Sequence, residues 1–168
     1  MESFEIDKAS KGKSILAVAR IASGWLMLWP FFDKLFGLGF QTPAGSGMID
    51  GGSPSSFITY VSGGSFKDFF DSLAGNTFVD ILLMAGLLIL GLTLILGIAS
   101  KLTTAAMTLF LFIMFLIHVP PTDNPIIDHR IIWILLIWAI YFLGGYDRLS
   151  LKKRWDDLGI VRKFPILE

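Results

Sequence analysis

The stretch DNPIIDHRIIWILLIWAIYFLGGY, residues 123–146, decides the fold. Its first third is rich in polar and charged side chains, and the remainder is an almost uninterrupted apolar run. Pro125 suits the first turn of a helix, where its missing N–H group is not needed, and Asn124 or Asp123 can cap that turn. A helix over 125–145 has about 20 residues and a length of about 30 Å, which matches the hydrocarbon core of a bilayer. The pattern therefore predicts a transmembrane helix.

Three further apolar runs precede this one, at 14–37, 77–98 and 102–119. The chain is 54% hydrophobic and only 17% charged, with a mean hydropathy of +0.67, and four consecutive runs that are not amphipathic disfavour a soluble α-helical domain. We therefore predict an all-α integral membrane protein, a bundle of four transmembrane helices in a single domain over 1–168. The first run is expected to act as its own insertion signal.

The long connection at 38–76 is expected to hold an amphipathic helical segment. Its first half is rich in Gly, Ser and Pro, which favour turns. In the second half Phe66, Phe69, Phe70 and Leu73 recur at helical spacing with charged residues between them. Such a segment lies at the membrane interface or covers the end of the bundle.

The distribution of basic residues predicts the orientation. Eleven of the 14 Lys and Arg residues fall on the side that holds the N-terminus, the turn at Lys101 and the tail over 146–168. The positive-inside rule therefore places both termini in the cytoplasm and the loop 38–76 outside. The basic tail favours contact with anionic membrane lipid. Residues 1–13 are expected to be flexible or surface-lying, and Arg20 either reaches back to the headgroups or has a buried partner between helices.

Composition also excludes several kinds of chemistry. The chain has no cysteine, which removes disulfides, iron–sulfur clusters and thiolate metal sites, and its formal net charge of zero argues against a nucleic-acid partner. The histidines His118 and His129 are not at a helical spacing for metal ligands. We predict no haem, iron–sulfur cluster or metal ion, so a redox role requires an organic cofactor or a partner subunit.

The predicted topology brings the membrane-proximal polar residues to one end of the bundle. They come from all four spans, and they are Asp33, Lys34, Asp80, His118, Asp128, His129 and Arg130. A pocket that is polar above and apolar below suits an amphiphile with a polar head and an isoprenoid-like tail. His118 or His129 is then a proton exchanger, Asp128 and Asp80 are orienting or proton-accepting carboxylates, and Lys34 and Arg130 are donors to a carbonyl or an anion. The alternative is that these residues are only helix caps and headgroup-level charges.

Three blocks carry a resemblance to a known family. They are RIASGWLMLWPFFDKLFGLGF at 20–40, GLLILGLTLILGIASKL at 86–102 and DNPIIDHRIIWILLIWAIYFLGGYDRLSL at 123–151. The chain resembles the DoxX family, and most closely its DoxD branch, the small membrane subunit of thiosulfate:quinone oxidoreductase. The resemblance implies a subunit in a prokaryotic plasma membrane that acts in or beside an oxidoreductase passing electrons to quinone, with a soluble or membrane redox partner. It carries over Asp33, Lys34 and Asp128 as motif positions.

Two other functions stay open from the sequence. The basic tail and the lack of cysteine fit a non-catalytic subunit that anchors or assembles a soluble redox partner at the membrane. A small transporter ranks third, because no charged residue falls at the centre of a predicted span. A stripe of small residues, Gly86, Thr93 and Gly97, predicts close helix packing and permits a homo-oligomer.

Overall fold

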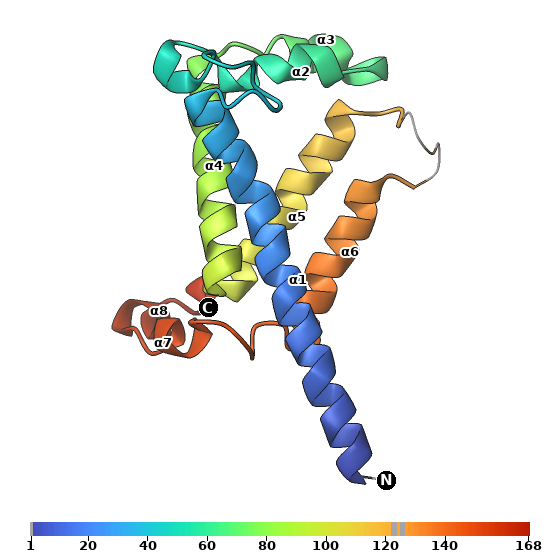
Figure 1. Ribbon diagram of the computed structural model, residues 1–168, viewed down its shortest axis with the longest axis vertical. Coiled ribbons are helices and arrows are strands. Elements are labelled where there is room, and N and C mark those ends of the chain that lie inside the picture. The colour runs from blue at the N-terminus through green and yellow to red at the C-terminus, as the bar shows by residue number, and fades with distance from the viewer. Residues whose placement is uncertain (1, 122–123, 125–126) are drawn as a thin grey trace.

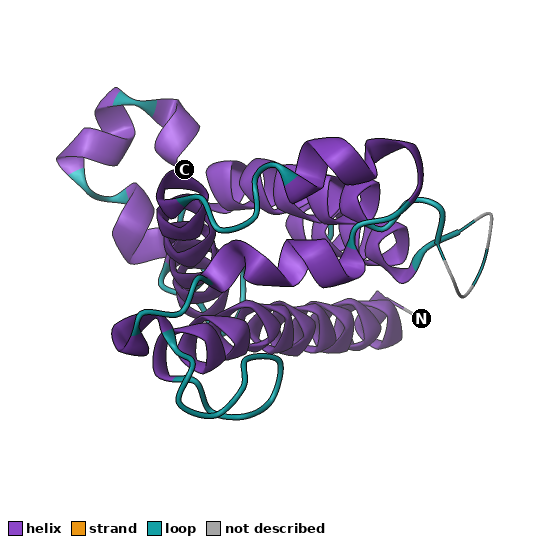
Figure 2. Ribbon diagram, turned by 90° about the horizontal axis from the view of Figure 1, so that it is seen from above, coloured by secondary structure: helices purple, strands orange, loops and turns teal. Residues whose placement is uncertain are grey.

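The computed structural model describes residues 2–121, 124 and 127–168, and every regular element in that part of the chain is helical (Figures 1 and 2). The four principal helices are α1 (Glu2–Phe36), α4 (Thr77–Leu96), α5 (Ser100–Ile117) and α6 (His129–Phe142). Between α1 and α4 a layer of short helices lies across the top of the molecule in Figure 1. The short helices that follow α6 lie at the opposite end.

Three helices are long and apolar enough to cross a membrane, as expected of an integral membrane protein. They are Asp7–Phe36 within α1, Thr77–Leu96 and Ser100–Ile117. The fourth, α6, is equally apolar but has 14 residues, a length of about 21 Å. Of the predicted flexible or surface-lying start over 1–13, residues 2–13 are helical, because α1 is one continuous helix from Glu2, and its N-terminal part projects beyond the bundle (Figure 1).

The starts of α4 and α6 are fixed by side-chain caps. Asn76 Oδ1 accepts the N–H groups of Phe78 and Val79 at 2.9 and 3.4 Å and thereby caps α4. Asp128 Oδ1 accepts the N–H of Arg130 at 2.7 Å and thereby caps α6. The predicted start of this helix at 125 is therefore too early; Pro125 and Asp123 lie outside the described residues.

The closest helix contact joins α1 to α4 through two glycines. A Cβ atom on Gly24 would lie 2.8 Å from the carbonyl oxygen of Gly91 and 2.9 Å from the nitrogen of Ile95. Only glycine leaves room for backbones at this separation. The predicted packing at Gly86 is wrong, because a Cβ atom there would meet nothing within 4 Å. A homo-oligomer across this open face stays a prediction.

Arg20 fastens three segments together at the end of the bundle that lies away from the top layer. Its side chain is fully buried and donates to five backbone carbonyls: Leu94, Ile95 (3.1 Å), Gly145 (3.1 Å), Arg148 (3.3 Å) and Leu149 (2.6 Å). These carbonyls belong to the C-terminal end of α4 and to the chain after α6. Of the two alternatives for Arg20, the structure shows the buried one, although its partners are carbonyls and not carboxylates.

The layer across the top, which we call the lid (residues 48–71), is built from very short helices. They are η1 (Met48–Asp50), η2 (Pro54–Phe57), α2 (Ile58–Val61), η3 (Gly64–Phe66) and α3 (Lys67–Asp71). The predicted amphipathic segment is thus helical. Ile58 and Phe70 pack on Ile117 at the end of α5, and the N–H of Gly63 donates to the Ile117 carbonyl at 3.3 Å. The lid therefore covers the end of the bundle.

The tail after α6 is folded at the end of the bundle opposite the lid (Figure 1). It forms α7 (Lys152–Asp156), α8 (Gly159–Lys163) and η4 (Pro165–Leu167). Lys101 at the start of α5 holds the last residue, because its backbone N–H donates to the Glu168 carbonyl and its ammonium pairs with the Glu168 carboxylate, both at 2.7 Å.

Candidate functional site

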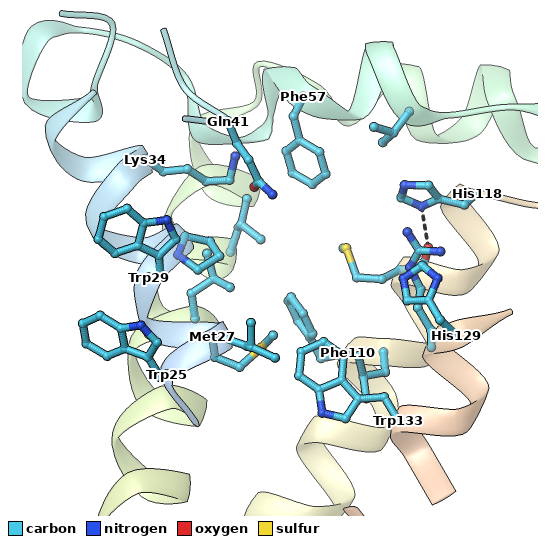
Figure 3. A pocket seen from close by; sticks show the side chains of 18 of the residues that line it. Trp25, Met27, Trp29, Lys34, Gln41, Phe57, Phe110, His118, His129 and Trp133 are labelled. Atoms are coloured by element: carbon cyan, nitrogen blue, oxygen red, sulfur yellow. Dashed lines mark hydrogen bonds between the residues drawn. The ribbon is translucent and has the colours of Figure 1, made fainter. Parts of the chain in front are cut away.

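A cavity of about 990 Å³ lies beneath the lid, between α1, α4, α5 and α6 (Figure 3). Most of its lining is apolar and aromatic. Trp25 and Trp29 contribute from α1, Leu87 from α4, Phe110 from α5 and Trp133 from α6. The volume is at the upper end of the range for small-molecule sites, so the cavity accommodates a drug-sized molecule.

The polar groups of the cavity gather near the lid and come from opposite walls. Lys34 extends from α1 toward Gln41 and Phe57, while His118 and His129 lie on the other side, as Figure 3 shows. Arg130 also lines this wall. The structure thus brings together four of the residues singled out from the sequence, and all four carry basic side chains.

Lys34 is the most deeply enclosed of these bases, with only 6% of its surface exposed. Its Nζ atom lies 4.4 Å from the centre of the Phe57 ring, in a cation–π contact. Pro30, one turn earlier on α1, also lines the cavity, which places this face of the helix toward the interior.

His118 follows the last residue of α5 and is partly buried. Its Nδ1 atom lies 2.8 Å from the carbonyl oxygen of Met114. Because that oxygen can only accept, Nδ1 carries the proton and Nε2 is the unprotonated nitrogen of the neutral ring. Burial lowers the pKa of His118, and the nearby Arg130 charge lowers it further, so the ring is neutral at physiological pH and can accept a proton.

Arg130 is held in place by the residue that caps its own helix. Its Nη1 atom lies 2.8 Å from Asp128 Oδ2, and both side chains are largely buried. Burial by itself would raise the pKa of Asp128, but the backbone N–H and the guanidinium of Arg130 keep that pKa below its usual value. The carboxylate is therefore ionised and orients Arg130. His129 Nδ1 lies 3.8 Å from the same carboxylate oxygen, on a largely exposed side chain.

The three candidate acids do not line the cavity. Asp33 is buried and accepts the backbone N–H groups of Phe40, Gln41 and Thr42 at 3.2, 2.9 and 2.8 Å, which closes the turn after α1. Asp80 is buried too. It accepts the Ser53 hydroxyl at 2.9 Å and the Ser55 N–H at 2.7 Å, which ties the lid to α4. These carboxylates position the cavity's walls and cover.

The aromatic lining of the cavity and the contributions of the long loop were not predicted from the sequence. Trp133 belongs to the apolar run that predicts the fourth transmembrane helix, yet it lines the cavity and its Nε1 donates to Ser23 Oγ at 3.2 Å. An indole that occurs in an apolar run just inside a polar helix start is a signal that could have been used. Gln41 and Phe57 lie in the long connection at 38–76, and the turn-forming residues of this connection do not indicate which of its side chains face the bundle.

A second cavity of about 410 Å³ shares Leu26, His129 and Trp133 with the first and extends between α1 and α6. Its other lining residues are almost all apolar. Within the described part of the chain, no group of three or more His, Asp or Glu side chains is arranged to hold a metal ion. No protein-family model, curated protein sequence or solved structure matches this chain.

Proposed function

We propose that this protein is a membrane subunit that binds a quinone-type or lipid-like amphiphile beneath its lid and works with an oxidoreductase that passes electrons to membrane quinone. The observation that carries the proposal is the cavity of about 990 Å³, whose walls are largely apolar and whose Lys34, Gln41 and His118 side chains lie near the lid (Figure 3). A ligand with one polar end and one apolar end matches that division. The second cavity supports the proposal, because it offers an apolar path for a tail between α1 and α6.

The side chains fit the proton and hydrogen-bond chemistry of a quinone head. Reduction of a quinone to a quinol consumes two electrons and two protons, and in this proposal the electrons come from the partner subunit. Lys34 donates to a head oxygen, and Arg130 is a second donor on the opposite wall. His118 is the proton exchanger, since its neutral ring has one nitrogen fixed by Met114, while the other has no hydrogen-bond partner among the described residues.

The proposal includes an arrangement in the membrane. In it α6 and the apolar residues that flank it complete a bundle of four transmembrane helices in a prokaryotic plasma membrane. The lid lies at the outer face, and both termini lie in the cytoplasm, as the distribution of basic residues predicts.

The test is mass spectrometry of lipophilic molecules extracted from the gently purified protein. Met114 lines the cavity from α5, so Met114→Trp should fill part of it, whereas Leu109 on the same helix is 60% exposed and Leu109→Trp serves as the matched control. We expect a stoichiometric quinone or other isoprenoid in the wild type and in Leu109→Trp, and a several-fold lower amount in Met114→Trp. Equal amounts of bulk phospholipid alone in all three proteins would contradict the proposal.

A second candidate is a subunit that anchors a soluble redox partner and performs no chemistry. The folded tail favours it, because Lys153 and Arg154 are exposed on α7 while Lys152 is paired with Asp156. A double charge reversal, Lys153→Glu with Arg154→Glu, should then release a co-purifying partner without changing the extracted lipid. Loss of the lipid with retention of the partner on Met114→Trp would separate the two roles.

A further inference from the structure

The charge of the cavity lining is one-sided. Among its lining residues are Lys34, His118, His129 and Arg130, and the described lining holds no Asp or Glu. The acids that lie nearest in sequence are directed elsewhere: Asp33 closes the turn after α1, and Asp128 caps α6 and holds Arg130. The lining thus carries the positive charges of Lys34 and Arg130. Asp128 offsets the charge of Arg130, whereas no carboxylate in the described lining offsets that of Lys34.

The uncompensated positive charge is that of Lys34. The residue is buried, with 6% of its surface exposed, and it lines the cavity. Over the described residues, no carboxylate lies within 4.0 Å of its ammonium group and no hydrogen bond satisfies it; its recorded contact is the face of Phe57. A buried ammonium group is costly unless an anion or several acceptors surround it.

Asp33, which precedes Lys34 directly, attracts its ammonium group through space but forms no ion pair with it. Successive helical residues point about 100° apart around the axis, so the two side chains leave α1 in different directions. The carboxylate oxygens of Asp33 already accept three backbone N–H groups from residues 40–42. Among the described residues Lys34 thus has no ion-pair partner, and its ammonium group faces the cavity.

We propose that the end of the cavity near the lid is an anion subsite centred on Lys34, which selects amphiphiles with a negatively charged oxygen on an apolar body. This inference rests on the proposed function and adds the charge of the ligand's head. Gln41, which lies beside Lys34 (Figure 3), supplies an amide donor, and Arg130, which also lines the cavity, contributes a guanidinium from α6. Carboxylates, phosphate monoesters and ionised phenol-type oxygens share the chemistry that this subsite recognises.

The test compares two ligands that differ only in the charge of the head. Dibromostearate and its methyl ester are titrated into nanodiscs of zwitterionic phosphatidylcholine that contain the full chain, at a mildly alkaline pH that keeps the carboxylate ionised. Binding is measured as saturable quenching of tryptophan fluorescence by bromine, since Trp25, Trp29 and Trp133 line the cavity. The variants are Lys34→Met, which keeps the length of the side chain, and Lys34→Arg, which keeps its charge. Lys67→Met on the exposed face of the lid is the control.

We expect the wild type, Lys67→Met and Lys34→Arg to bind the acid at least about tenfold more tightly than the ester. In Lys34→Met the two affinities should become equal through loss of acid binding, while the affinity for the ester stays unchanged. That unchanged affinity shows that the variant is folded. Dodecyl phosphate should compete with the acid, and excess acetate or inorganic phosphate should not, because the tail supplies most of the binding energy.

Equal affinity of the wild type for acid and ester would overturn the anion subsite and leave the proposed amphiphile site standing. Displacement by acetate or inorganic phosphate alone would overturn the requirement for an apolar body. Failure of both brominated ligands, and of a neutral quinone, to quench the wild type would instead count against the proposed function itself.

Discussion

At the scale of single residues, the acidic and the basic side chains around the cavity have different roles. Asp33, Asp80 and Asp128 accept backbone or side-chain donors and hold the turn after α1, the lid and the start of α6. Lys34, His118 and Arg130 line the cavity. Arg20 differs from these three residues, because its guanidinium donates to backbone carbonyls at the other end of the bundle.

Replacement of Arg20 should be severely destabilising. Arg20→Met leaves the five carbonyls without their donor, and each buried acceptor that stays unsatisfied costs about 1–3 kcal/mol. Allowing for partial relaxation, we expect a loss of at least about 3 kcal/mol. Thermal unfolding in detergent, compared with Lys8→Met on the exposed start of α1, provides the measurement. A melting temperature equal to that of Lys8→Met would show that the contacts add nothing.

His118 should make stability depend on pH. Its pKa in the folded protein is lowered, chiefly by burial and also by Arg130 and His129, against the opposing effects of the Met114 carbonyl and Asp128. The unfolded chain therefore binds the proton more readily. The contribution of the neutral ring to stability is complete above about pH 6.5 and falls as the pH drops below that value toward the folded pKa.

The measurement is the melting temperature of the wild type and of His118→Gln over this pH range. Glutamine cannot titrate, and its amide can still donate to the Met114 carbonyl. We expect the wild type to lose stability on acidification more steeply than His118→Gln. Parallel curves for the two proteins would assign the acid sensitivity to other groups.

At the scale of elements, the positions of the long helices could be predicted from the sequence, because each is an uninterrupted apolar run between polar segments. The start of α6 could not. Pro125 and Asp128 both suit a helix start, and Asp128 is the cap that the structure shows. The buried state of Arg20 also depends on carbonyls from α4 and the chain after α6, which no local pattern specifies.

The candidate site was predictable to the level of its end of the bundle but not to the level of its lining. Asp33 and Lys34 are neighbours in an equally polar position, and helix rotation alone decides that Lys34 lines the cavity. Likewise, Asp80 accepts hydrogen bonds from Ser53 and Ser55 only because the lid packs against α4. Such choices depend on tertiary packing, so residue type and spacing do not contain them.

The contact between α1 and α4 should be sensitive to a single methyl group. Gly24→Ala would place its Cβ 2.8–2.9 Å from backbone atoms of α4, which cannot move aside as a side-chain tip can. We expect a loss of about 1–3 kcal/mol, the usual cost of overpacking. Gly12→Ala on the same helix meets nothing within 4 Å and should be neutral or stabilising by up to about 1 kcal/mol. Unfolding in detergent distinguishes the pair, and equal stability of the two variants would contradict the close contact.

At the scale of the whole molecule, the lid and the folded tail cover opposite ends of the helices (Figure 1). The proposed arrangement places these ends on opposite sides of the membrane. Because the natural chain has no cysteine, single cysteines can report on each side without a background. Asp50 in the lid and Lys153 in the tail are both exposed.

We expect Asp50→Cys to react with a membrane-impermeant maleimide in intact cells that express the protein. Lys153→Cys should react only after the membrane is permeabilised. The readout is the fraction of labelled protein, and a permeant maleimide that labels both variants is the control. Labelling of Lys153→Cys in intact cells would reverse the proposed orientation.

The five hydrogen bonds from Arg20 to backbone carbonyls restrict the movement of α1. Any rotation or axial shift of α1 that moved Lys34 out of the cavity would also pull Arg20 away from its five acceptors, because both residues belong to one continuous helix. We therefore expect α1 and α4 to keep their positions relative to each other. A route from the bilayer into the cavity would then open by movement of α6, which is bound to α1 less tightly than α4 is. Such a movement must break the hydrogen bond between Trp133 on α6 and Ser23 on α1.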